Sequence, residues 1–340
     1  MIVLQAVRKL KKGKGNVELV EVDKPVIGPK DVLMKVWAAG VCGSDLNIQD
    51  DTHFYDAPVT IGHEYSGVVV EVGSEVKNIK IGDKIVSDIE APEGWLGVQI
   101  DGSYAPFMRI PECVVHICPP DMPLDAAALV EPVVATIHCL QERNNIEAGD
   151  FVVVVGPGPM GILAVQFAKL RGARKVVLVG LHVDKKRLEI GKKVGADLTL
   201  FYEDGALEKI MELSGGGADF VADCAGTESG TQFAIDVAKP SNTGKGGRGR
   251  IALVAMWGRP ITLSMDKASM GQLNFAGGWS WNGPETWEKA IELLYRGCFD
   301  YKSIITSHYK LEEWELAFAN LRARKDVKAL INPNGTNWAQ

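Results

Sequence analysis

Residues 151–180 read FVVVVGPGPMGILAVQFAKLRGARKVVLVG. The stretch contains an apolar run, a glycine-rich turn, a segment with helical spacing and a second apolar run, and this order predicts a parallel βαβ unit. Strand-like runs at 218–226 and 249–258 follow, and they alternate with further helical stretches. This alternation is typical of a doubly wound parallel sheet with helices on both faces. The middle of the chain is therefore predicted to be an α/β domain.

The glycines of this turn have the G-x-G-x-x-G spacing of a dinucleotide-binding site. Gly156 permits a tight turn, Gly158 lets the backbone approach a pyrophosphate, and Gly161 lets the helix pack on the strand. Pro159 and Met160 open the helix, whose N-terminal N–H groups would face the phosphates. Because the motif follows an apolar strand and opens a helix, it predicts a Rossmann domain that binds NAD or NADP.

The end of the second apolar run lacks the acidic residue that usually accepts hydrogen bonds from the adenosine ribose of NAD. Gly180 stands at that position, and His182 follows it. Three cations come next, Lys185, Lys186 and Arg187. An uncharged strand end flanked by cations would admit a 2′-phosphate, so the sequence slightly favours NADP over NAD. Asp184 is the alternative, because its carboxylate could turn back to the ribose.

Length and composition indicate two domains and a small-molecule partner. The chain has 340 residues, of which 46% are hydrophobic and 24% charged, enough apolar material for two cores. Its formal net charge is -6 and it has no long Lys/Arg block, which argues against nucleic acid and anionic membranes as partners. The amino terminus has its basic residues after a short apolar stretch, the reverse of a secretory signal, so a cytoplasmic protein is expected.

Residues 1–120 contain short alternating or apolar runs broken by Gly, Pro and Asn/Asp, and they predict a mostly β region. Within it, Cys42 lies in AAGVCGSDLN, and His63 and Glu64 lie in TIGHEYSG. A thiolate, an imidazole and a carboxylate are all zinc ligands, and three protein ligands with one open position form a catalytic site. On these residues alone, a buried thiol and a core histidine are the alternative.

Motifs that span nearly the whole chain carry a resemblance to a known family. They are AGVCGSDLN, TIGHEYSGVVVEVGSEVKNIKIGDKIV, GSYAPFMRIP, ALVEPVVATIHCL, VGPGPMG, KKVGAD, DFVADCAG and VKALINP. With these motifs the sequence resembles the zinc-dependent medium-chain alcohol dehydrogenases, and most of all their polyol branch of sorbitol and threonine type. The resemblance implies an α/β fold: a Rossmann doubly wound parallel sheet domain at 134–281, and a mostly β, GroES-like catalytic domain formed by 1–133 and 282–340.

By the family pattern, Cys42 and His63 bind the catalytic zinc. The third protein ligand, a cysteine in the alcohol dehydrogenases themselves, is replaced here by Glu131 in LVEPVV, as is typical of polyol and sugar dehydrogenases. The resemblance also implies that Glu64 lies close to the metal and exchanges with Glu131 as the ligand during turnover. Gly62 would let the backbone leave flat strand geometry, so that His63 and Glu64 both reach one ion.

The resemblance assigns catalytic roles to Ser44 and Asp45 beside Glu64. Ser44 corresponds to the hydroxyl that hydrogen-bonds the substrate alcohol and passes on its proton, although an N-cap for a helix starting at Asp45 fits it equally well. Asp45 corresponds to the carboxylate that orients the zinc histidine. The histidine that usually ends the proton relay is replaced by Asn47. The proton is therefore expected to leave through the ribose hydroxyls and water, with His53 as a weak candidate.

One common feature of the family is missing, a lobe with four closely spaced cysteines that holds a structural zinc. The corresponding interval at 87–101, SDIEAPEGWLGVQID, contains no cysteine, so one catalytic zinc and no structural zinc is expected per chain. Several aromatic residues are candidates for the substrate cleft, with the protein core or a subunit interface as the alternative. They are Phe54, Tyr55, Trp95, Trp257, Trp279 and Trp281.

The predicted activity is the reversible oxidation of a secondary alcohol, on a polyol or sugar-like substrate, with NAD(P) and zinc. Members of the family assemble as dimers or tetramers, partly through the strand that corresponds to 250–258, so a homodimer or homotetramer is expected. Two alternatives stay open: a zinc-free quinone or enoyl reductase of the same fold, and a non-catalytic nucleotide-binding relative. A zinc-free reductase would have no use for a thiol, an imidazole and a carboxylate together.

Overall fold

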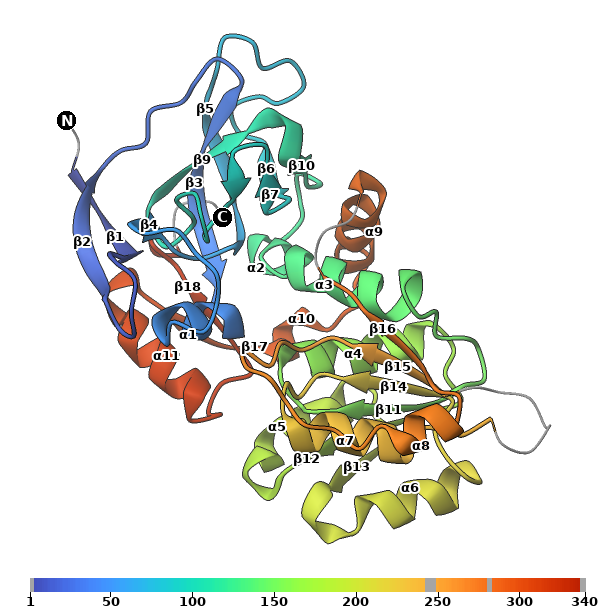
Figure 1. Ribbon diagram of the computed structural model, residues 1–340. Coiled ribbons are helices and arrows are strands. Elements are labelled where there is room, and N and C mark those ends of the chain that lie inside the picture. Colours follow the sequence, from blue (N-terminus) through green and yellow to red (C-terminus); the bar gives the residue numbers. More distant parts are fainter. Residues whose placement is uncertain (1–2, 242–248, 280–282, 337–340) are drawn as a thin grey trace. The chain divides into compact units, whose positions relative to one another are not determined.

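The computed structural model describes residues 3–241, 249–279 and 283–336, which form two compact units (Figure 1). The β-rich unit comprises Met1–Glu131, Gly283–Gly297 and Ile305–Gln340, and the α/β unit comprises Pro132–Asn282 and Cys298–Ile304. Residues 298–304, which the sequence analysis assigned to the catalytic domain, thus belong to the α/β unit. The reason is local, because the N–H of Asp300 donates to the side-chain oxygen of Gln166 over 2.6 Å.

The β-rich unit consists mainly of short strands and short helices. Its strands are β1 (Val3–Lys9), β2 (Val17–Asp23), β3 (Asp31–Gly40), β4 (Val59–Thr60), β5 (Glu64–Val72), β6 (Lys84–Ser87), β7 (Glu90–Ala91), β8 (Gly94–Trp95), β9 (Phe107–Pro111), β10 (Val115–Ile117), β17 (Ile305–Tyr309) and β18 (Lys328–Ile331). Its helices are α1 (Gly43–Gln49), η1 (Glu112–Val114), α2 (Leu124–Ala127), α9 (Pro284–Tyr295), η5 (Leu311–Glu313) and α11 (Trp314–Arg322).

Strand β3 is the centre of the β-rich unit. Its sequence, DVLMKVWAAG, is apolar at almost every position and buried along almost its whole length, as expected for a strand covered on both faces. β3 pairs antiparallel with β5, β9 and β18, within a sheet ordered β10-β6-β5-β3-β18-β17. Because the pairing places Gly40 opposite Glu64 and opposite Leu330 of β18, segments far apart in the sequence meet at the end of β3.

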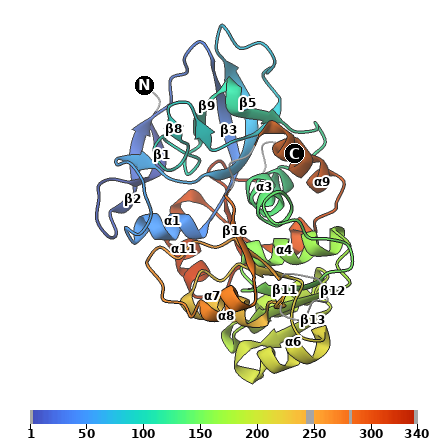
Figure 2. The ribbon, with the colours of Figure 1, turned by 45° about the vertical axis from the view of Figure 1, so that its right-hand side comes forward.

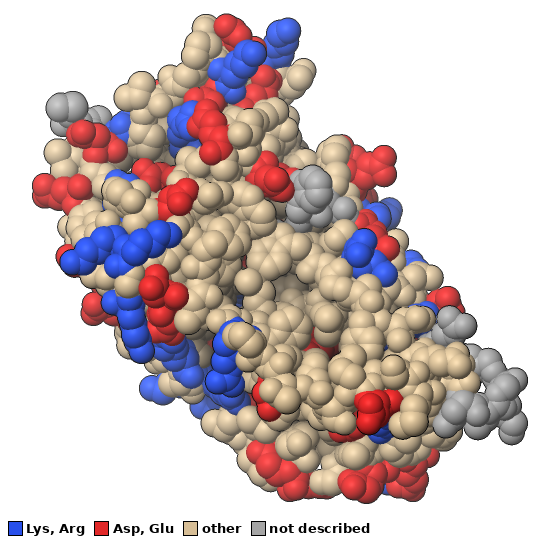
Figure 3. All heavy atoms as spheres, viewed as in Figure 1, with Lys and Arg blue, Asp and Glu red and all other residues tan. Residues whose placement is uncertain are grey.

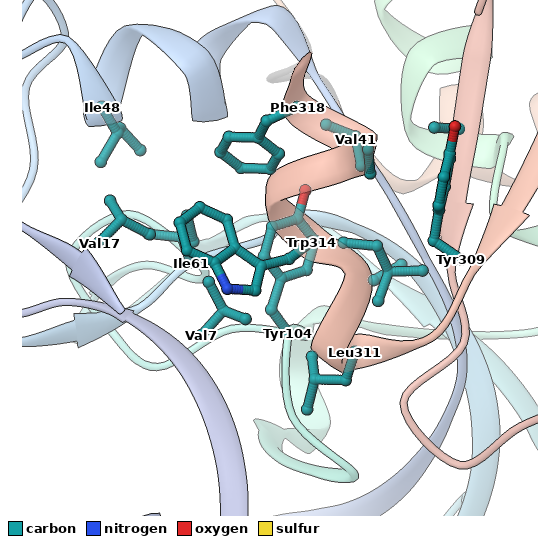
Figure 4. Packing of buried hydrophobic residues seen from close by; sticks show 14 of the residues in the cluster. Val7, Val17, Val41, Ile48, Ile61, Tyr104, Tyr309, Leu311, Trp314 and Phe318 are labelled. Carbon is teal, nitrogen blue, oxygen red and sulfur yellow. The ribbon is translucent and has the colours of Figure 1, made fainter. Parts of the chain in front are cut away.

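An aromatic core fills the space between this sheet, α1 and α11 (Figure 4). Trp314 and Phe318 of α11 meet edge to face with ring centroids 5.3 Å apart, and Tyr104 contacts Phe318 at 6.3 Å. Truncation of a buried aromatic side chain of this kind costs about 3–5 kcal/mol of stability. The same core therefore fixes Tyr104, whose hydroxyl reaches toward the N-terminal turn of α1.

The α/β unit alternates strands and helices. Its strands are β11 (Phe151–Val155), β12 (Lys175–Gly180), β13 (Leu198–Phe201), β14 (Phe220–Asp223), β15 (Arg250–Leu253) and β16 (Asn274–Gly277). Its helices are α3 (Val130–Ile137), which begins in the β-rich unit, the π-helix η2 (His138–Glu142), α4 (Pro159–Leu170), η3 (His182–Asp184), α5 (Lys185–Lys193), η4 (Tyr202–Asp204), α6 (Ala206–Ser214), α7 (Glu228–Val237), α8 (Asp266–Met270) and α10 (Tyr301–Ile304).

All six strands of the α/β unit are parallel, in the order β13-β12-β11-β14-β15-β16. Helices α4 and α5 pack beside each other on the sheet, and α6, α7 and α8 form a second group. Figure 2 shows α4 and α6 on opposite sides of the strands. β15 pairs on both sides, so the outer strand at that end is β16 and not the strand expected to mediate assembly.

Two further features are the apolarity of the helices and the distribution of surface charge. Among the described residues, no helix combines the length and the apolarity that crossing a bilayer requires. On the face shown in Figure 3, acidic and basic side chains are mixed, and neither sign covers the face.

Candidate metal site and coenzyme-binding turn

Cys42 lies at the N-terminus of α1, where it is the N-cap residue of the helix. Its backbone is extended, with φ -97° and ψ 157°, and its N–H donates to Oδ2 of Asp45 over 2.9 Å. The helix therefore begins at Gly43, and the alternative role considered for Ser44, the N-cap of a helix starting at Asp45, is excluded. The reason is that the carboxylate of Asp45 bonds back to the N–H of Cys42, which moves the cap upstream.

His63 and Glu64 leave the backbone at the start of β5. Gly62 before them has φ +99°, a conformation that favours glycine, and a Cβ atom there would lie 2.5 Å from the ring of Tyr104. The backbone therefore turns at Gly62 and enters the strand only at Glu64. This bend allows two consecutive side chains to approach one point, which flat strand geometry forbids.

Cys42, His63 and Glu64 form a compact donor cluster. The sulfur, a ring nitrogen and a carboxylate oxygen all lie within 4.8 Å of one another. His63 is 6% exposed and Glu64 is 2% exposed, whereas Cys42 is only half-buried, so the cluster is shielded from water on all but its thiol side. A soft sulfur, an imidazole and a carboxylate in such a largely buried group match the ligand preferences of zinc. The residues present therefore fit a tetrahedral zinc ion with one position left for substrate or water.

The electrostatics of the cluster also favour a bound cation. Burial by itself lowers the pKa of the His63 imidazole, but the negative charges of Asp45, Cys42 and Glu131 outweigh burial and raise it to about 10. Without a metal, this cluster would thus hold a proton on His63. A zinc ion would replace that positive charge with a stronger one.

Ser44 and Asp45 lie on either side of the His63 ring. Ser44 Oγ is 3.0 Å from Nε2, and Asp45 Oδ1 is 3.5 Å from Nδ1. Asp45 is fully buried and is held by two donors, the N–H of Cys42 and the hydroxyl of Tyr104, which is 2.8 Å from Oδ2. The carboxylate thus lies beside one ring nitrogen at ion-pair distance, without a hydrogen bond between the two atoms, while the other ring nitrogen faces the hydroxyl and the donor cluster.

Glu64 has a buried partner that the sequence analysis did not include. Nζ of Lys328 donates to Glu64 Oε2 over 2.5 Å and to the carbonyl oxygen of Val41 over 3.2 Å. Burial alone would lower the pKa of Lys328, but Glu64 and Cys42 raise it, so the ammonium form is retained. Lys328 therefore balances the negative charge of the cluster. A signal for it exists in the sequence, because a lysine interrupts the apolar run VKALI.

Glu131 lies outside the 4.8 Å donor cluster. It occupies the first turn of α3 and is half-buried. Its charge nevertheless reaches the site, since it contributes to raising the pKa values of both His63 and Lys328. The structure thus brings Cys42, His63 and Glu64 into one group and leaves Glu131 as a nearby carboxylate.

The remaining candidates of the β-rich unit differ in their surroundings. Asn47 lies in α1, and Nδ1 of His53 is 2.6 Å from the carbonyl oxygen of Phe54. Burial lowers the pKa of His53, and the charges of His63 and Asp45 also act on it. Phe54 meets Trp95 edge to face at 5.1 Å, whereas Tyr55 belongs to the core.

The glycine turn of the α/β unit has the expected geometry. Gly156 has φ +96°, Gly158 is the N-cap of α4, and Pro159 and Met160 are its first residues. A Cβ atom at Gly161 would lie 1.9 Å from the carbonyl oxygen of Gly156. The helix therefore approaches the turn so closely that only glycine fits there.

The end of β12 is surrounded by more carboxylates than the sequence around this strand indicates. Gly180 is the last residue of the strand, His182 opens η3, and Arg187 lies in α5, half-buried. The carboxylate of Asp184 accepts a hydrogen bond from the N–H of Leu181 over 3.0 Å, and it is buried. A second carboxylate, Glu203, also reaches this point, and nothing in the sequence around β12 predicts it.

The two aromatic candidates of the α/β unit that the structure describes are half-buried. Nε1 of Trp257 donates to Oγ1 of Thr231 over 2.8 Å, and Trp279 lies just after β16. Trp281 lies outside the described residues. Trp257 thus takes part in the interior hydrogen bonding of this unit.

Comparison with known proteins agrees with this geometry. A family model described as an alcohol dehydrogenase GroES-like domain matches residues 28–120, and one described as a zinc-binding dehydrogenase matches residues 159–296. The predicted fold class, a Rossmann sheet domain with a GroES-like, mostly β domain, is confirmed.

Relatives match over nearly the full length. A sorbitol dehydrogenase of Halalkalibacterium halodurans is 31% identical, with 97% of this chain and 99% of the relative covered. A D-arabitol-phosphate dehydrogenase of Enterococcus avium is 29% identical, with 97% and 98% covered. A crystal structure of a zinc-binding dehydrogenase from Sinorhizobium meliloti, bound to NADP, has a TM-score of 0.86 and 27% identity, with 98% and 100% covered. The chain belongs to the zinc-dependent medium-chain family of alcohol and polyol dehydrogenases.

Proposed function

We propose that this dehydrogenase oxidises a secondary hydroxyl group of a polyol or sugar-like substrate, reversibly, with NAD(P) as hydride acceptor and one catalytic zinc per chain. The observation that carries the proposal is the largely buried cluster of Cys42, His63 and Glu64, whose donor atoms lie within 4.8 Å of one another. When bound, zinc supplies a Lewis acid that polarises the substrate hydroxyl and lowers its pKa.

Four residues of the chain would hold the metal. Cys42 and His63 are its constant ligands, and the third ligand is a carboxylate, from Glu64 or Glu131. Glu64 is already within the donor cluster but is paired with Lys328, so release from the lysine would accompany direct ligation. Glu131 is the carboxylate that takes its place when Glu64 remains on Lys328.

Ser44 and Asp45 act on protons and orientation. Ser44 Oγ lies 3.0 Å from His63 Nε2, at the border of the donor cluster, where its hydroxyl would accept a hydrogen bond from the substrate hydroxyl and take up its proton. Asp45 holds the imidazole of His63 by its Nδ1 side. The side-chain amide of Asn47 does not take up or release a proton near neutral pH, so the proton would pass from Ser44 to water, and to the ribose hydroxyls of the coenzyme when it is bound.

The coenzyme binds along the glycine turn of the α/β unit. Gly156 and Gly158 would allow the pyrophosphate to approach the backbone, and the N-terminus of α4 at Pro159 and Met160 would face its charge. The adenosine end would lie near Gly180 and His182, with Arg187 close by in α5.

The polyol assignment depends on relatives. A sorbitol dehydrogenase and a D-arabitol-phosphate dehydrogenase, both similar to this chain over nearly its full length, are named for sugar alcohols. Glu131 in place of a cysteine points in the same direction. A homodimer or homotetramer is part of the proposal, and a cytoplasmic location stays a prediction.

One experiment tests the metal and the reaction together. Purified protein is assayed against polyols and secondary alcohols with NAD⁺ and NADP⁺, and zinc is quantified on the same sample. We expect about one zinc per chain, and Cys42→Ser should lose the metal and about a thousandfold or more in kcat/KM. Cys113→Ser, at an exposed cysteine of the same unit, is the matched control and should keep both. Bound nucleotide with no zinc and no alcohol oxidation would instead indicate a zinc-free reductase.

A further inference from the structure

We propose that Glu203 and Asp204, which follow β13, make this enzyme select NAD over NADP by placing carboxylates where a 2′-phosphate would have to bind. This inference rests on the proposed function, because it assumes that a nicotinamide dinucleotide binds at the glycine turn. Both residues lie more than twenty positions after the end of β12, whereas the residue that usually determines coenzyme choice stands at that strand end.

The end of β12 has no room for the acidic side chain that usually stands there. A Cβ atom at Gly180 would lie 2.8 Å from Cγ and 3.0 Å from Cδ of Pro157. The proline ring belongs to the glycine turn and cannot swing away as a flexible side chain would. An aspartate or glutamate at position 180 would therefore push the strand away from the turn that holds the pyrophosphate.

Two carboxylates that follow β13 take the place of this acidic side chain. Both carboxylate oxygens of Glu203 lie 3.2 Å from the backbone nitrogen of His182, which donates to them. Oδ1 of Asp204 lies 2.9 Å from Nε2 of the same histidine. The His182 ring also stacks on Phe201, with centroids 4.4 Å apart and planes inclined by 27°. Two acidic side chains from the neighbouring strand end are thus fixed beside the end of β12.

The backbone N–H groups that follow β12 already have acceptors. A phosphate at a helix start is bound by free N–H groups. Here the N–H of Leu181 donates to Asp184 and the N–H of His182 donates to Glu203. Both donors are already used by carboxylates, so a 2′-phosphate would find repulsion in place of hydrogen bonds. A neutral 2′-hydroxyl can instead donate to a carboxylate, as it does in NAD-binding relatives of this fold.

The cations of α5 act in the opposite direction but from a weaker position. Lys185 and Lys186 are exposed in the first turn of the helix, where water and salt screen their attraction. Glu203 and Asp204 are exposed as well, but hydrogen bonds to the backbone nitrogen and the ring of His182 hold their carboxylates at the strand end. These contacts outweigh the screened charges, so the slight preference for NADP drawn from the sequence is reversed.

The test compares binding of NADH and NADPH to the purified zinc-loaded protein by titration of nicotinamide fluorescence, which does not depend on turnover. The wild type should bind NADH at least about tenfold more tightly than NADPH. In the double variant Glu203→Gln with Asp204→Asn, this ratio should fall by about tenfold or more. The matched control, Glu212→Gln with Glu315→Gln, removes two exposed carboxylates elsewhere and should leave the ratio unchanged.

The outcomes separate this inference from the function on which it rests. Equal or tighter binding of NADPH by the wild type, or an unchanged ratio in the Glu203/Asp204 variant, overturns the inference. If the double variant does not fold, competition of adenosine 2′,5′-bisphosphate and AMP against NADH on the wild type decides the same point, with AMP expected to compete better. Selective NADH binding without oxidation of any alcohol overturns the proposed function alone, and failure of both nucleotides to bind overturns both.

Discussion

The donor cluster of the β-rich unit and the glycine turn of the α/β unit are built in different ways. The turn consists of backbone within one continuous segment, 156–161, and its geometry depends on the absence of side chains. The cluster consists of charged and polar side chains, and its support comes from Tyr104 and from Lys328. One site is thus a local property of the chain, whereas the other is a network of charges that only the folded chain completes.

The strongest way to break the network is to remove Lys328, the lysine that forms a buried ion pair with Glu64. Lys328→Met leaves the carboxylate of Glu64 buried without its ion-pair partner, and loss of one member of a buried pair costs about 3–5 kcal/mol. We expect a loss of about 4 kcal/mol in the metal-free protein, measured by urea unfolding. Zinc affinity should rise at the same time, because a positive charge has left the site.

Two comparisons control this prediction. Lys209→Met removes an exposed ion pair with Glu212 and should change stability by less than about 0.5 kcal/mol. The double variant Glu64→Gln with Lys328→Met removes both charges and should recover much of the stability lost by Lys328→Met. A single variant as stable as the wild type would show that the pair contributes nothing.

The corresponding change in the turn is Gly161→Ala. Its new Cβ would meet the carbonyl oxygen of Gly156 at 1.9 Å, so the helix and turn must separate, at a cost of about 3 kcal/mol. NADH binding should be lost as well, since the pyrophosphate site is displaced. Gly158→Ala is the control within the same turn, because its Cβ has open space around it. That variant should keep the melting temperature and lose only NADH affinity; equal stability losses in both would contradict the steric argument.

The contrast explains how much the sequence could predict. The spacing of Gly156, Gly158 and Gly161 after an apolar strand specifies a tight turn into a helix. The turn and the fold of this unit could therefore be predicted from the local sequence pattern. Cys42, His63 and Glu64 were found through a family motif, since neighbours in a strand would not otherwise be expected to share one ion. Lys328 stands out in the sequence only as a lysine within the apolar run VKALI. Its partner could not be predicted, because Lys328 is 264 residues from Glu64 and its role exists only once β18 pairs with β3.

The same limit applies to the coenzyme end. The sequence around β12 shows cations, and from them the slight preference for NADP was drawn. Glu203 reaches His182 across the neighbouring strand end, and only the parallel register of β12 and β13 brings the two together. The sequence analysis was therefore incomplete where a site depends on contacts between elements, and not on a pattern within one element.

A second histidine, which is half-buried, sharpens the comparison, because burial is the cause that shifts its pKa. His116 of β10 stacks on Trp287 of α9, with centroids 5.1 Å apart and planes inclined by 1°, and burial lowers its pKa to about 4. The unfolded value is 6.5. As the pH falls, the unfolded chain therefore takes up this proton first, and stability that is intact above pH 6.5 is lost between pH 6.5 and about 4.

His116→Phe should remove this loss. The pKa difference corresponds to about 3 kcal/mol, and partial exposure to solvent reduces it to about 2 kcal/mol. Urea unfolding at pH 7 and pH 4.5 measures the effect: the variant should resemble the wild type at pH 7 and exceed it at pH 4.5. Parallel stability profiles of the two proteins would rule out His116 as the titrating group.

The smallest expected effect on stability tests the far end of the network, Tyr104. Tyr104→Phe removes the hydroxyl that donates to Asp45 over 2.8 Å, and a hydrogen bond to a buried carboxylate contributes about 1.5 kcal/mol. On the proposal that Asp45 orients His63, we also expect zinc affinity to fall by about tenfold, the lower end of the range for groups that support a metal ligand. Tyr309→Phe is the matched control, because its hydroxyl donates to a buried carboxylate, Asp326, in the same unit.

Competition with a zinc chelator measures the affinity, and urea unfolding measures the stability of the metal-free proteins. Similar stability losses in the two variants, with weaker zinc binding only in Tyr104→Phe, would mean that the hydroxyl acts on the metal through Asp45 and His63. Equal zinc affinities would mean that the Cys42 N–H alone fixes Asp45, and that the network ends one residue earlier than its geometry indicates. Either result separates the part of the aromatic core that serves the metal from the part that only fills space.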